Sequence, residues 1–311
     1  MDRKLTSVAG ALIVTFLIFL GMVYIGGNML GIASLQTGEN PVLRFAFVFL
    51  GLLIVFAIYY LTRDSAAWVV GTREVVYMAI GAALYAIFSW LFNGTVFVVP
   101  SISQVALRPA ICIPMFFGYA FGPVVGFFSG AVGNMVGDAL TGFGLSPQWS
   151  VGNGLVGFVS GLAMLFPDKR KSLNTLLIVG GVLVALAVAL YIFNPTIPNM
   201  LFFDPANNIF GDAQISVFAG VSILVGFVLV LAVRFLVKNE DVAAAVAWAM
   251  LGNLLGIGFA AISDIWINGY SLPATMVGQF LPAAGPNLIF GAILVPLLIL
   301  AYSAVQRQTG R

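Results

Sequence analysis

Histidine is absent from this chain of 311 residues, and charged residues are scarce, at 8% of the total. Soluble domains carry charge on about a quarter of their residues. Because 61% of the residues are hydrophobic as well, the composition excludes an ordinary soluble domain and predicts an integral membrane protein. The formal net charge is only +2 and the basic residues form short scattered clusters, so we expect no nucleic-acid partner.

Cysteine and the common catalytic motifs are missing or nearly so. The single cysteine, Cys112, lies in an apolar stretch, which excludes an internal disulfide and a cysteine-rich metal site. We interpret it as a small packing residue. The chain has no His-Glu-x-x-His zinc motif and no Gly-x4-Gly-Lys-Ser/Thr loop for nucleotide phosphates. We therefore expect no metal, no cofactor and no ATP hydrolysis by this chain.

Ten apolar segments have roughly the length that crosses a bilayer, about 17 to 25 residues. They lie near residues 5–31, 45–61, 75–93, 105–121, 124–142, 150–167, 173–193, 214–237, 242–264 and 286–305. The sequence therefore predicts an all-α fold, a polytopic membrane bundle of about ten transmembrane helices. The first segment is too long for the apolar core of a signal peptide, so we expect it to be retained.

The positions of lysine and arginine support this count of helices. With a cytoplasmic N-terminus, eleven of the thirteen basic residues fall in inner segments, as the positive-inside rule requires. These eleven are Arg3, Lys4, Arg63, Arg73, Lys169, Arg170, Lys171, Arg234, Lys238, Arg307 and Arg311. Only Arg44 and Arg108 fall on the outer side. We therefore expect a multi-pass protein of the plasma membrane with both termini in the cytoplasm.

The expected outer loops are long, whereas the inner connections are short and charged. The outer loops cover residues 93–105, 142–149, 194–213 and 265–285. An elaborate outer surface favours the capture of a molecule from outside the cell. The alternative is that these proline-containing loops lie on the lipid headgroups.

Polar side chains gather in the stretch 108–161. Asn134 and Asp138 stand one helical turn apart and share a face, while Trp149 and Asn153 lie near the start of the next expected helix. Polar groups inside or beside hydrocarbon are costly, and they are usually functional or tightly paired. This stretch is therefore a candidate binding site.

Later helices bring similar groups to the same side of the membrane. Asp264 lies at the end of an outgoing helix and is followed by Trp266, and Asn287 lies at the start of an ingoing helix. The convergence predicts an outer cavity covered by loops. There, aromatic rings would stack on a planar ligand while amides and a carboxylate fix its orientation.

Each of these residues also has a purely structural interpretation. Asn153 and Asn287 would cap helix starts, and the tryptophans would anchor the protein at the membrane interface. Asp138 would pair with Arg108, so that each charge neutralises the other.

A stripe of small residues follows the segment 75–93. Ala79, Ala82, Ala83 and Ala86 recur at helical spacing. Such a stripe lets another helix approach to backbone contact. That helix belongs either to this protein or to a partner.

Several motifs occur in an order that resembles the S components of energy-coupling factor (ECF) transporters. The motifs are Arg73 before the alanine stripe, Arg108-Pro109 with Pro114, Phe121 to Gly126, Gly137-Asp138, Trp149 to Gly157, Leu281-Pro282, and Pro286 to Gly291. Taken together, they match the order of the helices in that family.

The resemblance implies a division of the chain. It covers roughly residues 72–167 and 242–305, which would supply a six-helix core. The chain would then consist of an N-terminal two-helix hairpin, 1–71, and an S-component-like membrane domain, 72–311. Within this domain the hairpin 173–237 would be an insertion.

The resemblance also implies a function. In that family the S component binds a vitamin or a related micronutrient in a pocket open to the outside. It then joins a transmembrane T subunit and two ABC ATPase subunits, which drive a toppling motion that delivers the ligand inward. By position, the substrate-binding residues would be Asn134, Asp138, Trp149, Asn153, Asp264, Trp266 and Asn287, and the residues docking on the T subunit would be Ala79, Ala83 and Ala86. The chain itself would not be an enzyme.

Three other functions stay open. One is a stand-alone secondary carrier or channel for a small organic solute, although carriers usually place ionisable groups at mid-membrane within inverted repeats. An intramembrane aspartyl protease is disfavoured because the Gly-x-Gly-Asp pattern fails at Met135. The third is a structural subunit of a larger complex. The ligand is equally open among riboflavin, thiamine, another vitamin, a modified base and an amino acid.

Overall fold

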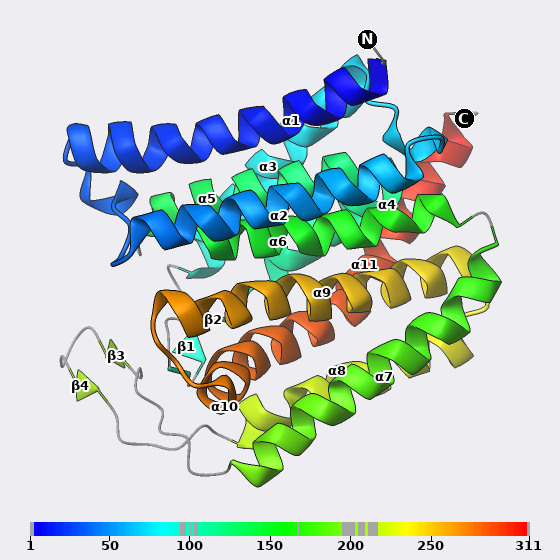
Figure 1. Cartoon of the computed structure of the whole chain (residues 1–311). Helices are drawn as coiled ribbons and strands as arrows, with labels where there is room; N and C mark the ends of the chain where they lie inside the picture. Colours follow the sequence, from blue (N-terminus) through cyan, green and yellow to red (C-terminus); the bar gives the residue numbers. More distant parts are fainter. Residues whose placement is uncertain are drawn as a thin grey trace.

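The computed structural model describes residues 3–93, 98–99, 101–102, 105–142, 144–166, 168–194, 203–204, 209–210 and 217–309. Within these residues the chain is almost entirely helical. The long helices lie side by side, with the two termini at one end of the bundle and the strands and short helix of the loops at the other (Figure 1).

The elements follow one another in this order. The helices are α1 (Arg3–Leu20), continued by the π-helical η1 (Gly21–Met29), then η2 (Ala33–Leu35), α2 (Pro41–Thr62), η3 (Ala66–Trp68), α3 (Thr72–Asn93), η4 (Pro109–Ile111), α4 (Cys112–Phe121), α5 (Pro123–Thr141), α6 (Pro147–Gly161), η5 (Leu162–Leu165), α7 (Lys169–Phe193), α8 (Val217–Leu236), α9 (Glu240–Ile267), α10 (Leu272–Thr275), the π-helical η6 (Met276–Phe280) and α11 (Leu281–Gln308). Two antiparallel pairs of short strands, β1 (Val98–Val99) with β2 (Val105–Ala106) and β3 (Phe203–Asp204) with β4 (Ile209–Phe210), lie in the loops.

The helices agree in length and composition with a membrane protein. Within the described part of the chain, seven helical stretches are long and apolar enough to cross a bilayer. Two further apolar helices, Pro109–Phe121 and Gly220–Leu236, are shorter. The architecture confirms the all-α polytopic bundle predicted from the sequence. Most of the expected outer loop 194–213 lies outside the described residues.

Glycines allow the central helices to approach one another closely. A Cβ atom added at Gly118, Gly126 or Gly157 would collide with the backbone of the facing helix, which brings α4, α5 and α6 together. Gly152 and Gly256 do the same between α6 and α9. Because close backbone packing replaces the hydrophobic effect as the attraction between helices in lipid, the glycine-rich sequence directly determines the tight centre of the bundle.

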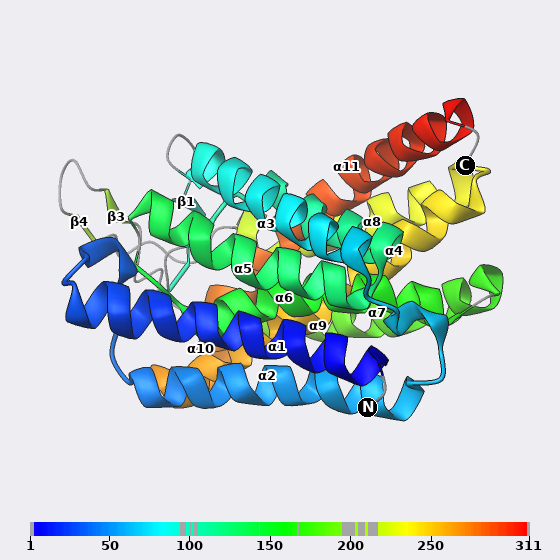
Figure 2. The ribbon, with the colours of Figure 1, turned by 90° about the horizontal axis from the view of Figure 1, so that it is seen from above.

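Two hairpins flank this centre on opposite sides. The pair α1 and α2 packs on α5 and α6, while α7 and α8 pack on α9 and α11 (Figures 1 and 2). Between the hairpins, α9 and α11 lie beside α4 and α6 in the interior, although they come late in the sequence.

The turn between α4 and α5 is set by Gly122, whose φ of 112° suits glycine, and by Pro123 at the first position of α5.

The last helix begins earlier than the sequence predicts. The expected loop 265–285 becomes helical at Leu272 and stays helical through η6 into α11. Two prolines misled the prediction, since proline usually interrupts a helix. Here Pro273 lies in the first turn of α10, and the π-helical segment η6 immediately precedes Pro282, which lies in the first turn of α11.

Candidate functional site

A cavity of about 260 Å³ lies near the end of the bundle that carries α10 and the strand pair of β1 and β2. It is formed by side chains from α2, α5, α6, α9, η6 and α11 and from the segments that precede η4 and α6. The lining residues are Arg44, Val105, Ala106, Arg108, Asn134, Asp138, Gly144, Ser146, Gln148, Trp149, Asn153, Ile257, Asp264, Asn268, Gln279, Ala283 and Asn287. Most of them carry hydrogen-bonding side chains, which is the expected signature of a functional cavity in a membrane bundle.

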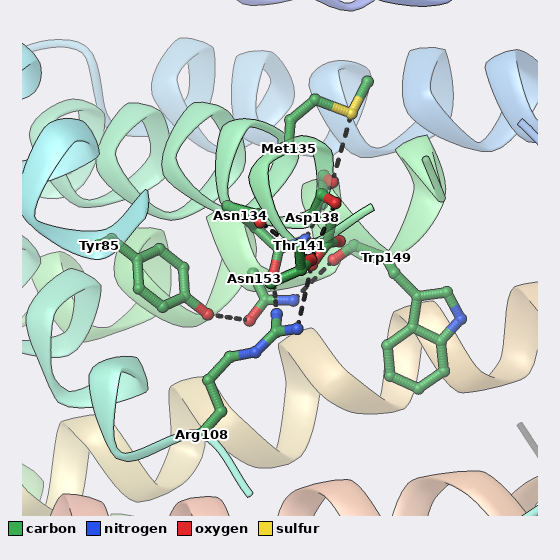
Figure 3. A network of polar contacts seen from close by, with 10 residues as sticks. Tyr85, Arg108, Asn134, Met135, Asp138, Thr141, Trp149 and Asn153 are labelled. Carbon is green, nitrogen blue, oxygen red and sulfur yellow. Dashed lines mark hydrogen bonds and ion pairs between the residues drawn. The ribbon is translucent and has the colours of Figure 1, made fainter. Parts of the chain in front are cut away.

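An ion pair forms one wall of this cavity (Figure 3). Arg108 Nη2 lies 3.1 Å from Asp138 Oδ1, and Arg108 Nη1 also donates to Asn134 Oδ1. The Asn134 amide in turn donates to Asp138 Oδ2 at 2.7 Å and to Ser150 Oγ at 3.1 Å. The structural interpretation of Asp138, pairing with Arg108, is therefore confirmed. The pair also lines the cavity, so it holds the wall in shape where a ligand would lie.

A second set of bonds joins α3 to α6. The Tyr85 hydroxyl donates to Asn153 Oδ1 at 2.7 Å, and Asn153 Nδ2 donates to the Trp149 carbonyl at 2.9 Å (Figure 3). Asn153 lies inside α6, whose N-cap is Ser146, and Asn287 lies inside α11. The interpretation of these two asparagines as helix caps is therefore wrong.

Asp264 connects α9 to the start of α6. Its carboxylate accepts a hydrogen bond from Trp149 Nε1 at 2.9 Å and another from Gln148 Nε2 at 3.2 Å. Asp264 is 1% exposed and Gln148 is fully buried. The indole of Trp149 thus points into the protein, and it does not serve as an interfacial anchor.

Arg44 reaches the cavity from the N-terminal hairpin. It is 6% exposed, its Nε donates to the Glu39 carbonyl at 2.8 Å, and its Nη2 donates to Asn268 Oδ1 at 3.4 Å. The side chain of Asn40 donates to the Ile267 carbonyl at 2.8 Å. These contacts attach the start of α2 to the end of α9 at the edge of the cavity.

Gln279 is the least satisfied polar residue of the cavity wall. It is fully buried in η6 and lies beside the Asp264 carboxylate. Neither its Nε2 nor its Oε1 makes a hydrogen bond of normal geometry. Leaving a buried amide without partners costs free energy, and this amide lines the cavity.

Six of the seven predicted substrate-binding residues line the cavity. They are Asn134, Asp138, Trp149, Asn153, Asp264 and Asn287. Trp266 does not, since it is 59% exposed and its ring packs on Phe47, with 5.7 Å between centroids. Two residues along an α-helix turn the side chain by about 200°, so Trp266 faces away when Asp264 faces inward.

The predicted docking stripe divides into two faces. Ala79 and Ala83 are exposed, whereas Ala86 is 3% exposed. Ala86 lies where α3 packs on α5, opposite Gly137, which has no side chain to keep the helices apart. Ala86 therefore does not belong to the exposed face of α3 that carries Ala79 and Ala83.

The residues that sequence reasoning missed as site residues are mainly Arg44, Gln148, Asn268 and Gln279. A signal existed for Arg44, because it and Arg108 are the two basic residues outside the positive-inside pattern. Both line the cavity. No comparable signal marked Gln279, which the sequence places among prolines in an expected loop.

Comparison with known proteins identifies a family. The model of the S component of ECF-type riboflavin transporters matches residues 69–234, just over half of the chain. A UPF0397 protein of Vibrio atlanticus is 33% identical over 173 residues, which cover 54% of this chain and 92% of that protein. UPF0397 proteins of Aliivibrio salmonicida and Aliivibrio fischeri are each 36% identical over 98 residues, or 32% of this chain and 51% of those relatives. No solved structure matches the chain.

The family match divides the cavity. Arg108, Asn134, Asp138 and Asn153 fall within the matched residues, and Trp149 does as well. The other side of the cavity lies outside them. The matched part contains the ion-paired wall and five of the seven motifs that resemble S components, whereas Leu281-Pro282 and Pro286 to Gly291 lie outside it. The chain therefore belongs to the S component family of ECF-type riboflavin transporters, and it is a multi-pass membrane subunit of the substrate-binding type.

Proposed function

We propose that this protein captures a vitamin or a related micronutrient in the cavity described above and delivers it across the membrane by toppling. The observation that carries the proposal is the convergence of buried hydrogen-bonding side chains on one cavity at the loop end of the bundle. Ligand pockets combine a few directional polar groups with apolar and aromatic surface. Here Trp149, Ile257 and Ala283 supply the latter.

The cavity opens to the outside in this proposal, with both termini in the cytoplasm. The basic residues support this orientation, because all except Arg44 and Arg108 belong to the termini or to the connections at the same end of the bundle, as the positive-inside rule expects. A cavity at the other end would receive its substrate from the external medium.

The favoured substrate is riboflavin or a compound with a similar planar polar ring. We favour riboflavin because the matching family is described as the S component of riboflavin transporters. A volume of about 260 Å³ lies just below the range of small-molecule pockets, roughly 300 to 1,000 Å³. It suits a ring system better than a larger ligand such as a peptide.

Transport in this proposal depends on a T subunit and two ABC ATPase subunits. The exposed face of α3 supports docking, since Ala79 and Ala83 lie among the exposed apolar residues Val76, Ile80 and Leu84. Small residues flanked by larger apolar ones let a partner helix approach closely in lipid.

Substitution of Ala83 tests the docking surface. We expect Ala83→Trp to abolish riboflavin uptake by cells that co-express the T and ATPase subunits, because an indole holds the partner helix away. Riboflavin binding by the purified chain should be unchanged. The matched control is Ile178→Trp on the exposed face of α7, which should transport normally. Normal uptake by Ala83→Trp would remove α3 from the interface.

An uptake assay in liposomes distinguishes an ECF subunit from a stand-alone carrier. Liposomes that contain this chain alone should bind riboflavin without accumulating it under a proton or sodium gradient. Addition of the T and ATPase subunits with ATP should start uptake. Accumulation by the chain alone would instead identify a secondary carrier.

For the chain organisation we propose a six-helix core of α3, α4, α5, α6, α9 and α11. The hairpin 1–71 is then an N-terminal addition, and the hairpin 173–237 is inserted within the domain 72–311. The packing supports this division, since α7 and α8 lie outside α9 and α11 and, among the described residues, contribute no side chain to the cavity.

A further inference from the structure

The wall of the cavity that lies outside the family match has a different chemistry from the matched wall. It comprises Arg44 from α2, Asp264 and Asn268 from the end of α9, Gln279 from η6 and Asn287 from α11. We refer to these five residues as the second wall. None of them falls within residues 69–234.

The charges of the second wall do not neutralise each other directly. Among the described residues, no carboxylate forms an ion pair with Arg44. The Asp264 carboxylate acts on Arg44 electrostatically but binds Trp149 and Gln148 instead. Because a carboxylate has about four lone-pair positions, Asp264 can accept further hydrogen bonds. The second wall therefore presents a charged donor and a charged acceptor to the cavity.

Gln279 adds a neutral donor and acceptor at the same place. Its amide is fully buried, borders the cavity and lies beside the Asp264 carboxylate, and neither of its polar atoms makes a hydrogen bond of normal geometry. It lies on a π-helical segment, and such segments are frequent at functional sites. A ligand that offers a donor and an acceptor together would satisfy both polar atoms of this buried amide and remove the free-energy cost of leaving them unpaired.

The wall is fixed in place by the N-terminal hairpin. The backbone N–H of Leu145, next to the cavity, donates to the Gln36 carbonyl at 2.8 Å. The side chain of Asn40 donates to the Ile267 carbonyl at the end of α9. The turn between α1 and α2 is thus bonded to both the α5–α6 loop and α9. This holds Arg44 in position before a ligand arrives.

We propose that Arg44, Asp264 and Gln279 determine specificity by hydrogen-bonding the amide-type or imide-type edge of a planar heterocycle. An N–H group of the ligand would donate to Asp264 or to Gln279 Oε1. Adjacent carbonyl oxygens would accept from Arg44 and from Gln279 Nε2. A neutral ligand suits the cavity, because its two arginines and two aspartates balance in charge. The inference rests on the proposed function, whose substrate class it narrows.

The test uses the full-length chain in detergent with two probes, riboflavin and N3-methylriboflavin, in which a methyl group replaces the imide proton. Affinities are measured by quenching of flavin fluorescence. Wild-type protein should bind riboflavin at least tenfold more tightly than the methylated probe, because a buried acceptor that loses its donor is left unsatisfied.

Two variants with matched controls address the second wall. Arg44→Met and Gln279→Leu should each weaken riboflavin binding by about 10-fold to 100-fold. Gln279→Leu, which removes an acceptor for the ligand's N–H group, should also reduce the discrimination between the probes to less than threefold. Arg44→Met should leave this discrimination unchanged, because both probes keep the carbonyl oxygens to which Arg44 would donate. Arg63→Met, at the other end of α2, and Gln308→Leu, at the end of α11, are exposed controls that should behave as wild type. Thermal unfolding of the ligand-free variants checks that they fold.

The outcomes separate this inference from the proposed function. Wild-type affinity and wild-type discrimination in both variants would overturn the role of the second wall and leave the proposed function intact. If a variant unfolds, Arg44→Lys or Gln279→Glu replaces it, and the same two measurements, riboflavin affinity and discrimination between the probes, decide. A wild-type protein that binds neither probe would contradict the proposed substrate, and the imide-edge inference with it.

Discussion

The two walls of the cavity differ in how completely their polar groups are paired. On the wall within the family match, Arg108, Asp138 and Asn134 bind one another, and Tyr85 binds Asn153. On this wall only single buried atoms, Arg108 Nε and Gln148 Oε1, have no hydrogen-bond partner among the described residues. On the second wall, Arg44 lacks an ion pair among the described residues, and neither polar atom of Gln279 makes a hydrogen bond of normal geometry. The first arrangement stabilises the fold, whereas the second leaves groups available for a ligand. Substitutions in the two walls should therefore have different main effects.

The largest effect on stability should follow from breaking the buried ion pair. Arg108→Met leaves the Asp138 carboxylate buried without its cation, so we expect the free energy of unfolding to fall by about 3 kcal/mol. Chemical denaturation in mixed micelles measures this change. The exposed pair of Lys169 and Asp241 provides the control, since Lys169→Met should cost less than about 1 kcal/mol.

The double variant Arg108→Met/Asp138→Ala sharpens this prediction. Because it leaves no orphan charge, it should be more stable than Arg108→Met alone. A double variant that is less stable than the single one would show that the two residues contribute through packing and not through their charges.

A smaller effect should follow from removing one hydroxyl of the matched wall. In Tyr85→Phe, the Oδ1 atom of Asn153 loses its donor at a fully buried position. We expect a loss of about 1 to 2 kcal/mol of stability, measured by the same denaturation. Riboflavin affinity should change by less than threefold, because the hydroxyl is already used within the protein. A loss of affinity without a loss of stability would assign Tyr85 to ligand contact.

The smallest effect should be seen at Trp266. It is exposed and packs on Phe47 outside the cavity, so Trp266→Phe should change riboflavin affinity by less than twofold. Trp149→Phe, which removes the donor to Asp264, should weaken binding about tenfold. Equal effects of the two substitutions would contradict the distinction between the inward and the outward tryptophan.

The two flanking hairpins differ in whether they fall within the family match and in whether they reach the cavity. The family match runs through α7 and α8, yet, among the described residues, these helices leave the cavity untouched. The hairpin of α1 and α2 lies outside the match but supplies Arg44. The part of the chain that matches the family and the part that lines the cavity therefore overlap only partly.

Much of the site could be predicted because polar residues are so costly in an apolar chain. Asp138, Asn153, Asp264 and Asn287 stood out for that reason, and all line the cavity. The prediction failed for Trp266, where two positions along a helix reverse the direction of a side chain. It also missed Gln279, because helical structure across a proline-rich segment depends on a π-helical insertion that no local pattern revealed.

The sequence by itself determined that this chain is a bundle of membrane helices, since its hydrophobic segments cannot remain in water and its glycines permit close packing. It also determined which polar residues needed an explanation. Only the tertiary structure decided which of them meet, because α2, α9 and α11 are far from α5 and α6 in sequence and are brought together by packing. For the same reason, only the structure separated the residues that satisfy one another from those left to bind a ligand.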